Sequence, residues 1–274
     1  MIDLHIHSTL SDGTLSPEQI VARAASLGIS AIAIADHDVT EGIEAATSAA
    51  RPLGLQVVPA VEINTDYHDT EIHILGYFID PQAPVLVQLL EGIREGRRKR
   101  NRQIVQRLNA LGVGLSEQRV LEIAGAGSVC RPHIAFAMTE AGYVGSVTEA
   151  FDRFLGHGRP AFVPRASVTP QQAMDVIHAA GGISVIAHPL KVRDDSLVDS
   201  MIAAGAMGIE AFHTDHTPDQ QRHYLAMASR RGLLVTGGTD SHGPLWPRPV
   251  EIGSVNIPEW VWPQLLEARE RLRK

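Results

Sequence analysis

Short apolar segments alternate with amphipathic ones through much of the chain, and the two kinds predict strands and helices. At the N-terminus, apolar residues at positions 2, 4 and 6 alternate with Asp3, His5 and His7, as in a half-buried strand. The continuous apolar run at 29–35 predicts a strand buried on both faces. The predicted strands are 2–7, 29–35, 56–63, 71–78, 183–187, 208–212 and 233–236.

Helices are predicted between most of these strands. Ser16-Pro17, Thr169-Pro170 and Thr217-Pro218 each combine an N-cap residue with a proline at the first helical position. Strands that alternate with helices are typical of parallel β/α units, and the units here are numerous enough to close a barrel. The expected fold class is therefore α/β. The predicted helices are 16–27, 40–50, 169–180, 197–204 and one that begins at 217.

The pattern changes between residues 83 and 162, where helical spacing replaces the alternation of strands and helices. We interpret 83–162 as a small all-helical domain inserted into a barrel formed by 1–82 and 163–274. Its basic run at 94–102 indicates a solvated helix face or, beside a metal site, a region that attracts phosphates. The helices predicted here are 85–111, 118–124, 132–141 and 147–155.

Composition narrows the function mainly by exclusion. The 274 residues are 44% hydrophobic and 20% charged, as in an ordinary globular protein. No signal peptide or apolar run of about 18 residues is visible, so we expect no membrane association. The single cysteine, Cys130, excludes an internal disulfide and a cysteine-rich zinc site, and it favours a cytoplasmic location. The net charge of −7 argues against binding of a DNA duplex through overall charge.

Histidine and acidic residues collect where the predicted strands end. Alone, His5 and His7 are explained equally well as a polar strand face or as a metal-binding pair. The carboxyl ends of barrel strands form the face that carries chemistry, so the convergence of further residues there favours the metal. The residues at or just beyond strand ends are His5, His7, His37, Glu62, His188, Asp240 and His242.

Asp12 and His73 complete a set of nine candidate ligands. All are nitrogen or oxygen donors, which suits Mn²⁺, Fe²⁺ or Zn²⁺. The set exceeds the three or four ligands that one catalytic zinc ion uses. We therefore expect two or three ions with a bridging carboxylate. Mn²⁺ is the expected metal, with Fe²⁺, Zn²⁺ and Mg²⁺ as alternatives.

A second candidate site lies within 128–133, where Arg131 and His133 flank a predicted helix start. Free backbone N–H groups beside cationic side chains are typical of an anion site. The alternative is that Arg131 is a surface residue and His133 lies on a helix face; the nearby metal site favours phosphate binding. Lys191, just after His188, is a further candidate of this kind, whereas His213 and His216 receive no role.

The residues singled out above resemble the polymerase and histidinol phosphatase (PHP) superfamily. The resemblance spans essentially the whole chain. It implies a distorted (β/α)₇ barrel that holds a di- or trinuclear metal centre. The resembling motifs are His5-Ile-His7, Ser11-Asp12-Gly13, Ala35-Asp36-His37-Asp38, Glu62, His73, Ala187-His188-Pro189 and Asp240-Ser-His242.

The resemblance also implies roles for individual residues. Asp12 departs from family members that have histidine at this position, so Asp12 and His37 are alternatively expected to contact substrate or to move a proton. Asp240 is a further candidate for proton transfer. The implied ligand sets are His5, His7, Glu62 and Asp240 for a first ion, Glu62, His73 and His188 for a second, and Asp12, His37 and His242 for a third.

The helical insertion and the stretch 130–134 narrow the resemblance to PHP enzymes that act on nucleotides. These are 3′,5′-nucleoside bisphosphate phosphatases and 5′→3′ exoribonucleases of the RNase AM type. The implied reaction is metal-assisted hydrolysis of a 3′-phosphate, with Arg131 and His133 holding the 5′-phosphate. The expected partners are a small nucleotide or the 5′ end of a short RNA.

Three other functions remain open at this stage. A histidinol phosphatase would share the barrel but has less use for the Arg-Pro-His stretch at 131–133. A barrel amidohydrolase usually needs a carboxylated lysine between its metals, and no lysine lies at a suitable strand end. An RNA-binding module with structural metals would give binding without turnover. The sequence does not predict the oligomeric state.

Overall fold

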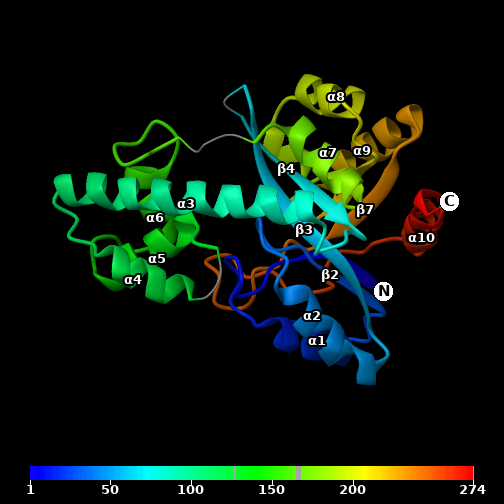
Figure 1. Ribbon diagram of the computed structural model, residues 1–274, viewed down its shortest axis with the longest axis horizontal. Coiled ribbons are helices and arrows are strands. Elements are labelled where there is room, and N and C mark those ends of the chain that lie inside the picture. The colour runs from blue at the N-terminus through cyan, green and yellow to red at the C-terminus, as the bar shows by residue number, and fades with distance from the viewer. Residues whose placement is uncertain (69, 126–127, 165–167, 274) are drawn as a thin grey trace.

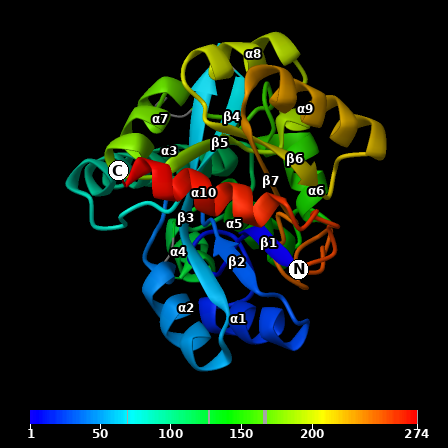
Figure 2. The same ribbon diagram turned by 90° about the vertical axis from the view of Figure 1, so that its right-hand side faces the viewer.

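The computed structural model describes residues 1–68, 70–125, 128–164 and 168–273, and a seven-stranded sheet forms its centre. The strands lie in chain order (Figures 1 and 2). The Asp240 N–H donates to the His5 carbonyl (2.8 Å) and the His7 N–H to the Ser241 carbonyl (2.9 Å), so the sheet closes on itself. The strands are β1 (Ile2–Ile6), β2 (Ala31–Ile34), β3 (Gln56–Tyr67), β4 (Thr70–Tyr77), β5 (Ile183–Ile186), β6 (Gly208–His213) and β7 (Leu234–Gly238).

This arrangement confirms the predicted barrel, with one correction at β4. The other neighbouring strands are parallel, but β4 is antiparallel to both β3 and β5. Only two residues separate Tyr67 from Thr70, too few for the crossover that parallel strands require. The chain therefore turns back as a hairpin, and the expectation of parallel β/α units is wrong at this position.

Helices surround the barrel, and several begin as the sequence predicts (Figure 2). Ser16, Thr169 and Thr217 each accept a hydrogen bond from the glutamine N–H three residues later, forming a capping box before a helix. The last helix has no predicted counterpart. The outer helices are α1 (Pro17–Ser26), α2 (Gly42–Ala50), α7 (Pro170–Ala179), α8 (Asp195–Ala203), α9 (Pro218–Arg231) and α10 (Val261–Leu272), with short 3₁₀ helices at Arg51–Leu53 and Pro189–Val192.

A long helix leads from the barrel to a group of shorter helices at one side (Figure 1). An apolar cluster distinct from the barrel's own packs these helices together, drawing its buried residues from 104–163. None of the described helices combines the length and apolar character that a bilayer-spanning helix requires. This segment comprises α3 (Pro84–Ala110), α4 (Glu117–Ala124), α5 (Arg131–Glu140), α6 (Val147–Ala150) and a π-helical turn at Phe151–Leu155.

Gly238, the last residue of β7, allows the barrel to close. A Cβ at this position would lie 2.3 Å from the His5 Cβ and 2.4 Å from the His5 backbone nitrogen. We expect Gly238→Ala to push β1 and β7 apart, to displace His5, and to lower the free energy of unfolding by about 1–3 kcal/mol. Thermal unfolding measures this effect.

Gly92→Ala is the matched control, because no atom lies within 4 Å of the added Cβ inside α3. The free energy of unfolding of this control should rise by about 0.5–1 kcal/mol, since alanine stabilises a helix more than glycine does. A melting temperature for Gly238→Ala equal to that of the native protein would contradict the steric argument.

Candidate metal centre

His5 on β1, His7 just after it and an aspartate after β7 form the inner part of the site. His5 and His7 are buried, and their Nε2 atoms lie 3.1 Å apart. The His7 Nε2 is also 3.1 Å from Asp240 Oδ1, and the His5 Nε2 is 3.5 Å from the same oxygen. Two imidazole nitrogens and a carboxylate oxygen at these separations surround a position that one cation can occupy.

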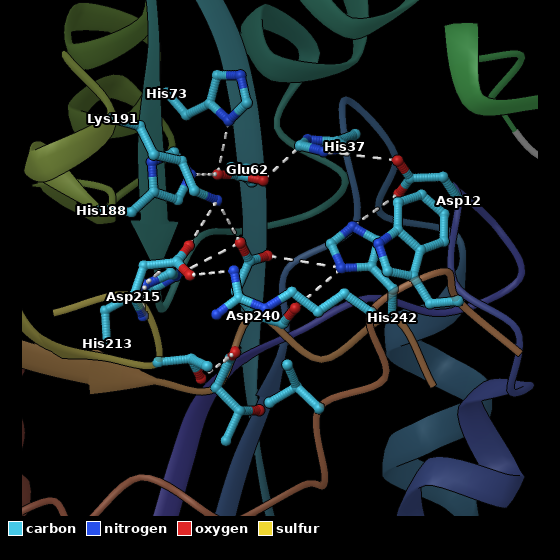
Figure 3. Close-up of a pocket in the computed structure, with 15 residues that line it drawn as sticks. Asp12, His37, Glu62, His73, His188, Lys191, His213, Asp215, Asp240 and His242 are labelled. Carbon is cyan, nitrogen blue, oxygen red and sulfur yellow. Dashed lines mark hydrogen bonds and ion pairs between the residues drawn. The ribbon is translucent and has the colours of Figure 1, made fainter. Parts of the chain in front are cut away.

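Glu62, on β3, is the central carboxylate (Figure 3). Its Oε1 is 2.9 Å from both His73 Nδ1 and His188 Nε2, and its Oε2 is 2.8 Å from His37 Nδ1. His73 comes from β4, where the hairpin pairs it with Asn64, two residues beyond Glu62 on the same strand face. A single buried carboxylate therefore contacts histidines from three segments of the chain.

Asp12 gathers the remaining predicted ligands. Its Oδ1 lies 3.4 Å from His242 Nε2 and 3.8 Å from His7 Nδ1, and its Oδ2 lies 3.9 Å from His37 Nε2. The ligand atoms of these four residues all fall within 4.8 Å of one another. All nine predicted ligands are thus brought into one connected cluster.

Two histidines of the cluster are held neutral. Burial, together with the neighbouring imidazoles of His242 and His37, lowers the pKa of His7 to about 4. Burial and the nearby ammonium group of Lys191 lower the pKa of His188 to about 3. At neutral pH both rings are therefore unprotonated, as a histidine must be to bind a metal.

Glu62 and His73 stabilise each other's charged forms. Burial alone would raise the pKa of Glu62, but the imidazoles of His37 and His73 hold it well below its usual value. Burial likewise opposes charge on His73, but Glu62 raises the pKa of this ring to about 9. A cation bound here would take the place of such protons.

The donor set fits a polynuclear metal centre. Glu62 Oε2 and Asp12 Oδ1 are buried carboxylate oxygens without a hydrogen bond, although imidazole nitrogens lie close to both. A buried acceptor without a donor is costly unless a cation completes it. The donors are carboxylate oxygens and imidazole nitrogens, which suit divalent transition metals.

A cavity of about 300 Å³ opens above the cluster (Figure 3). Candidate ligands such as Asp12, Glu62 and Asp240 line it. Lys191 and Asp215 lie at its side, with the Lys191 Nζ 2.7 Å from Asp240 Oδ2. The volume is suited to a small substrate.

A model of the PHP domain family matches residues 3–189. The chain belongs to the PHP family. The resemblance inferred from the motifs is thereby confirmed.

Relatives of this PHP protein act on nucleotides or RNA. A 5′-3′ exoribonuclease of Haemophilus influenzae is 36% identical over 247 residues, covering 88% of this chain and 90% of the relative. A 3′,5′-nucleoside bisphosphate phosphatase of Chromobacterium violaceum is 34% identical, covering 89% and 87% of the two chains. The crystal structure of a Bifidobacterium adolescentis protein assigned as a metal-dependent phosphoesterase matches with a TM-score of 0.89 and 31% identity, covering 98% and 96%.

Three residues in or beside the carboxylate–histidine cluster have an unusual backbone conformation. Asp38, His188 and Asp240 have positive φ angles of 57°, 26° and 53°. Side chains other than glycine rarely adopt this region, and such strain persists where the surrounding structure enforces it. Here it positions two candidate ligands and the neighbour of a third, His37.

The sequence analysis did not single out Glu210, whose carboxylate contacts two of the candidate ligands, His5 and His188. Glu210 is fully buried on β6; its Oε1 is 3.0 Å from His5 Nδ1, and its Oε2 accepts a hydrogen bond from the His188 N–H (2.8 Å). His213 lies nearby, with its Nε2 3.4 Å from Asp240 Oδ2. The available signal was a glutamate within an otherwise apolar strand.

We expect Glu210→Gln to weaken metal binding by about 10- to 100-fold, because the carboxylate orients the ring of His5 and increases its basicity. Titration of the metal-free protein with Mn²⁺ by calorimetry measures the change. Glu44→Gln, at an exposed position of α2 outside the cluster, makes the same change in charge and is the control. An unchanged dissociation constant for Glu210→Gln would contradict the supporting role.

A second, cationic cavity of about 140 Å³ adjoins the centre and shares Asp12, His37 and His73 with the first. Arg131, the first residue of α5, lines it and lies 3.0 Å from Glu71 Oε2. The other Glu71 oxygen is 3.1 Å from His73 Nε2. Glu71 thus connects the predicted phosphate ligand directly to a predicted metal ligand.

The basic run of α3 also reaches this second cavity. Arg97 is largely buried and donates from its Nε to Asp38 Oδ2 (2.9 Å), next to His37. Arg100 is buried as well and donates to the Val163 carbonyl (2.7 Å). For these two residues the interpretation as a solvated helix face is wrong.

The structure separates the other two predicted phosphate ligands. Lys191 lines the central cavity above Asp240. The His133 ring instead lines a mainly apolar cavity beside Phe136, and its Nδ1 accepts a hydrogen bond from the Cys130 N–H (2.9 Å). A phosphate contact by His133 therefore stays a prediction, whereas Arg131 and Lys191 lie in cavities that border the centre.

Proposed function

We propose that this protein is a metal-dependent phosphoesterase that removes the 3′-phosphate of nucleoside 3′,5′-bisphosphates, giving a nucleoside 5′-monophosphate and phosphate. The proposal extends to 5′→3′ removal of nucleotides from short 5′-phosphorylated RNA. The observation that carries it is the pair of adjoining cavities, one above the carboxylate–histidine cluster and one lined by Arg97 and Arg131. A substrate with two phosphate groups can place one in each.

The ions would be Mn²⁺, two or three per chain. Bound there, they would stabilise negative charge on the phosphoryl oxygens and supply a nucleophile at neutral pH. The ligand sets we propose are His5, His7, Glu62 and Asp240 for one ion, Glu62, His73 and His188 for another, and Asp12, His37 and His242 for a third.

The remaining chemistry belongs to side chains around the centre. Although burial opposes charge on Asp240, Lys191 and His5 hold its pKa well below the usual value, so this carboxylate is ionised, as a metal ligand must be. Asp240 is also the candidate to receive the proton of the attacking water. If the third site holds no ion, Asp12 and His37 would instead contact the substrate or move a proton to the leaving 3′-oxygen. The Lys191 ammonium group would contact the oxygens of the 3′-phosphate.

Arg131 would hold the 5′-phosphate and thereby fix which end of the nucleotide enters. We infer that residues 83–162 act as an inserted helical domain that contributes this contact, with the barrel formed by 1–82 and 163–274. The separate apolar cluster of the helices supports this division. We include His133, two residues after Arg131 on α5, in this contact as a prediction.

The test compares three substrates with the Mn²⁺-loaded protein: adenosine 3′,5′-bisphosphate, a short 5′-phosphorylated RNA, and histidinol phosphate. We expect AMP and phosphate from the first and stepwise 5′-mononucleotides from the second. Turnover of histidinol phosphate alone, or no turnover with metal content verified, would overturn the proposal.

A further inference from the structure

A large groove of about 890 Å³ leads away from the two cavities. It shares Arg100 and Arg131 with the second cavity and Lys191 with the central one. It is larger than the two cavities that would hold a mononucleotide, so a bisphosphate substrate leaves it unused.

The groove is cationic in a protein whose net charge is −7. Its described lining includes the cationic side chains of Arg100, Arg131, Lys191 and Arg193, against the carboxylates of Asp66 and Glu71. The positive charge of the groove attracts an anionic ligand, and the negative charge of the rest of the protein disfavours binding elsewhere on the surface. Arg193, directly after the 3₁₀ helix that carries Lys191, extends the positive charge outward.

An aromatic pair lines the same groove. The rings of His157 and Phe162 have centroids 5.0 Å apart, and the Arg100 guanidinium lies 5.7 Å from the Phe162 centroid. Flat aromatic side chains beside a positively charged channel are typical of sites for single-stranded nucleic acid, where bases stack and cations follow the backbone.

We propose that this groove binds the nucleotides that follow the first one in a single-stranded oligonucleotide. The inference rests on the proposed function, because the first nucleotide must occupy the two inner cavities. The chain then continues from the phosphate at the metal centre past Lys191, with a backbone phosphate at Arg193 and a base against His157 and Phe162. The groove thereby makes an oligonucleotide a better substrate than a mononucleotide.

The experiment compares kcat/KM for adenosine 3′,5′-bisphosphate with kcat/KM for 5′-phosphorylated oligoadenylates of increasing length. The variant is Arg193→Glu, and Arg230→Glu on α9, outside the groove, is the matched charge reversal. We expect Arg193→Glu to lower kcat/KM for the longer oligonucleotides on the order of tenfold while sparing the bisphosphate. The salt dependence of log KM for the oligonucleotides should also lose a slope of about 0.7 per phosphate contact removed.

A third variant, Arg248→Glu, tests whether the oligonucleotide leaves the central cavity in a different direction. Arg248, which pairs with Asp215 at 3.0 Å, lies on another side of the central cavity. If Arg248→Glu rather than Arg193→Glu lowers oligonucleotide turnover, the chain leaves on that side and the proposal is wrong. The same holds if length has no effect or if oligonucleotides are not cleaved. A protein that fails on the bisphosphate itself refutes the proposed function instead.

Discussion

Replacing Glu62 by glutamine should abolish most of the activity and most of the metal binding. The carboxylate is fully buried and contacts His37, His73 and His188, so its neutral analogue leaves these groups without their central negative charge. Breaking a buried pair of this kind costs about 3–5 kcal/mol. Expressed as catalysis, this corresponds to roughly two to four orders of magnitude in kcat/KM.

Metal content by mass spectrometry and phosphate release from adenosine 3′,5′-bisphosphate measure the two effects together. Glu44→Gln is the control, because Glu44 is exposed on α2 and undergoes the same chemical change. Full metal occupancy in Glu62→Gln with activity within a few-fold of the native protein would show that Glu62 is not the shared ligand.

Replacing Arg131 by alanine should remove the preference for a 5′-phosphate. A hydrogen bond to a charged group contributes about 1.5–3 kcal/mol, so kcat/KM for adenosine 3′,5′-bisphosphate should fall by roughly 10- to 150-fold. The loss should be mainly in KM, because this contact is made to a part of the substrate that does not react. Turnover of 3′-AMP, which lacks the 5′-phosphate, should change little.

Arg131→Lys offers a complementary measurement. The Glu71 carboxylate pairs with Arg131, so an incoming phosphate must displace it. Arg131→Lys should retain part of the discrimination, because lysine keeps the charge but not the planar pair of donors. Equal losses on both substrates in Arg131→Ala would place Arg131 outside the 5′-phosphate site.

Most of the candidate metal ligands could be predicted because their positions follow from the strand pattern. His5, His7 and His188 lie in or after short buried strands, and the barrel brings these positions to one face. Glu210 escaped notice because no local rule distinguishes a supporting carboxylate within a strand from an ordinary polar residue. Only the neighbouring strands show that it faces His5.

The inward arginines of α3 could have been recognised. Arg97 and Arg100 continue the helical stripe that Leu86, Leu90 and Ile104 define, so their spacing placed them on the buried face. The basic composition of this run suggested that its side chains are exposed to solvent, whereas the helical periodicity correctly predicts that Arg97 and Arg100 face inward. The reversal of β4 was also available from the short separation between two strands, since no crossover fits there.

The hairpin of β3 and β4 makes the metal centre sensitive to alignment. Backbone pairing sets Asn64 opposite His73 and so fixes how far His73 lies from Glu62. A shift of β4 by a single residue would turn every one of its side chains to the other face of the sheet and carry His73 outside the barrel. Insertion or deletion of a single residue within β4 would therefore remove a candidate metal ligand from the site without changing His73 itself.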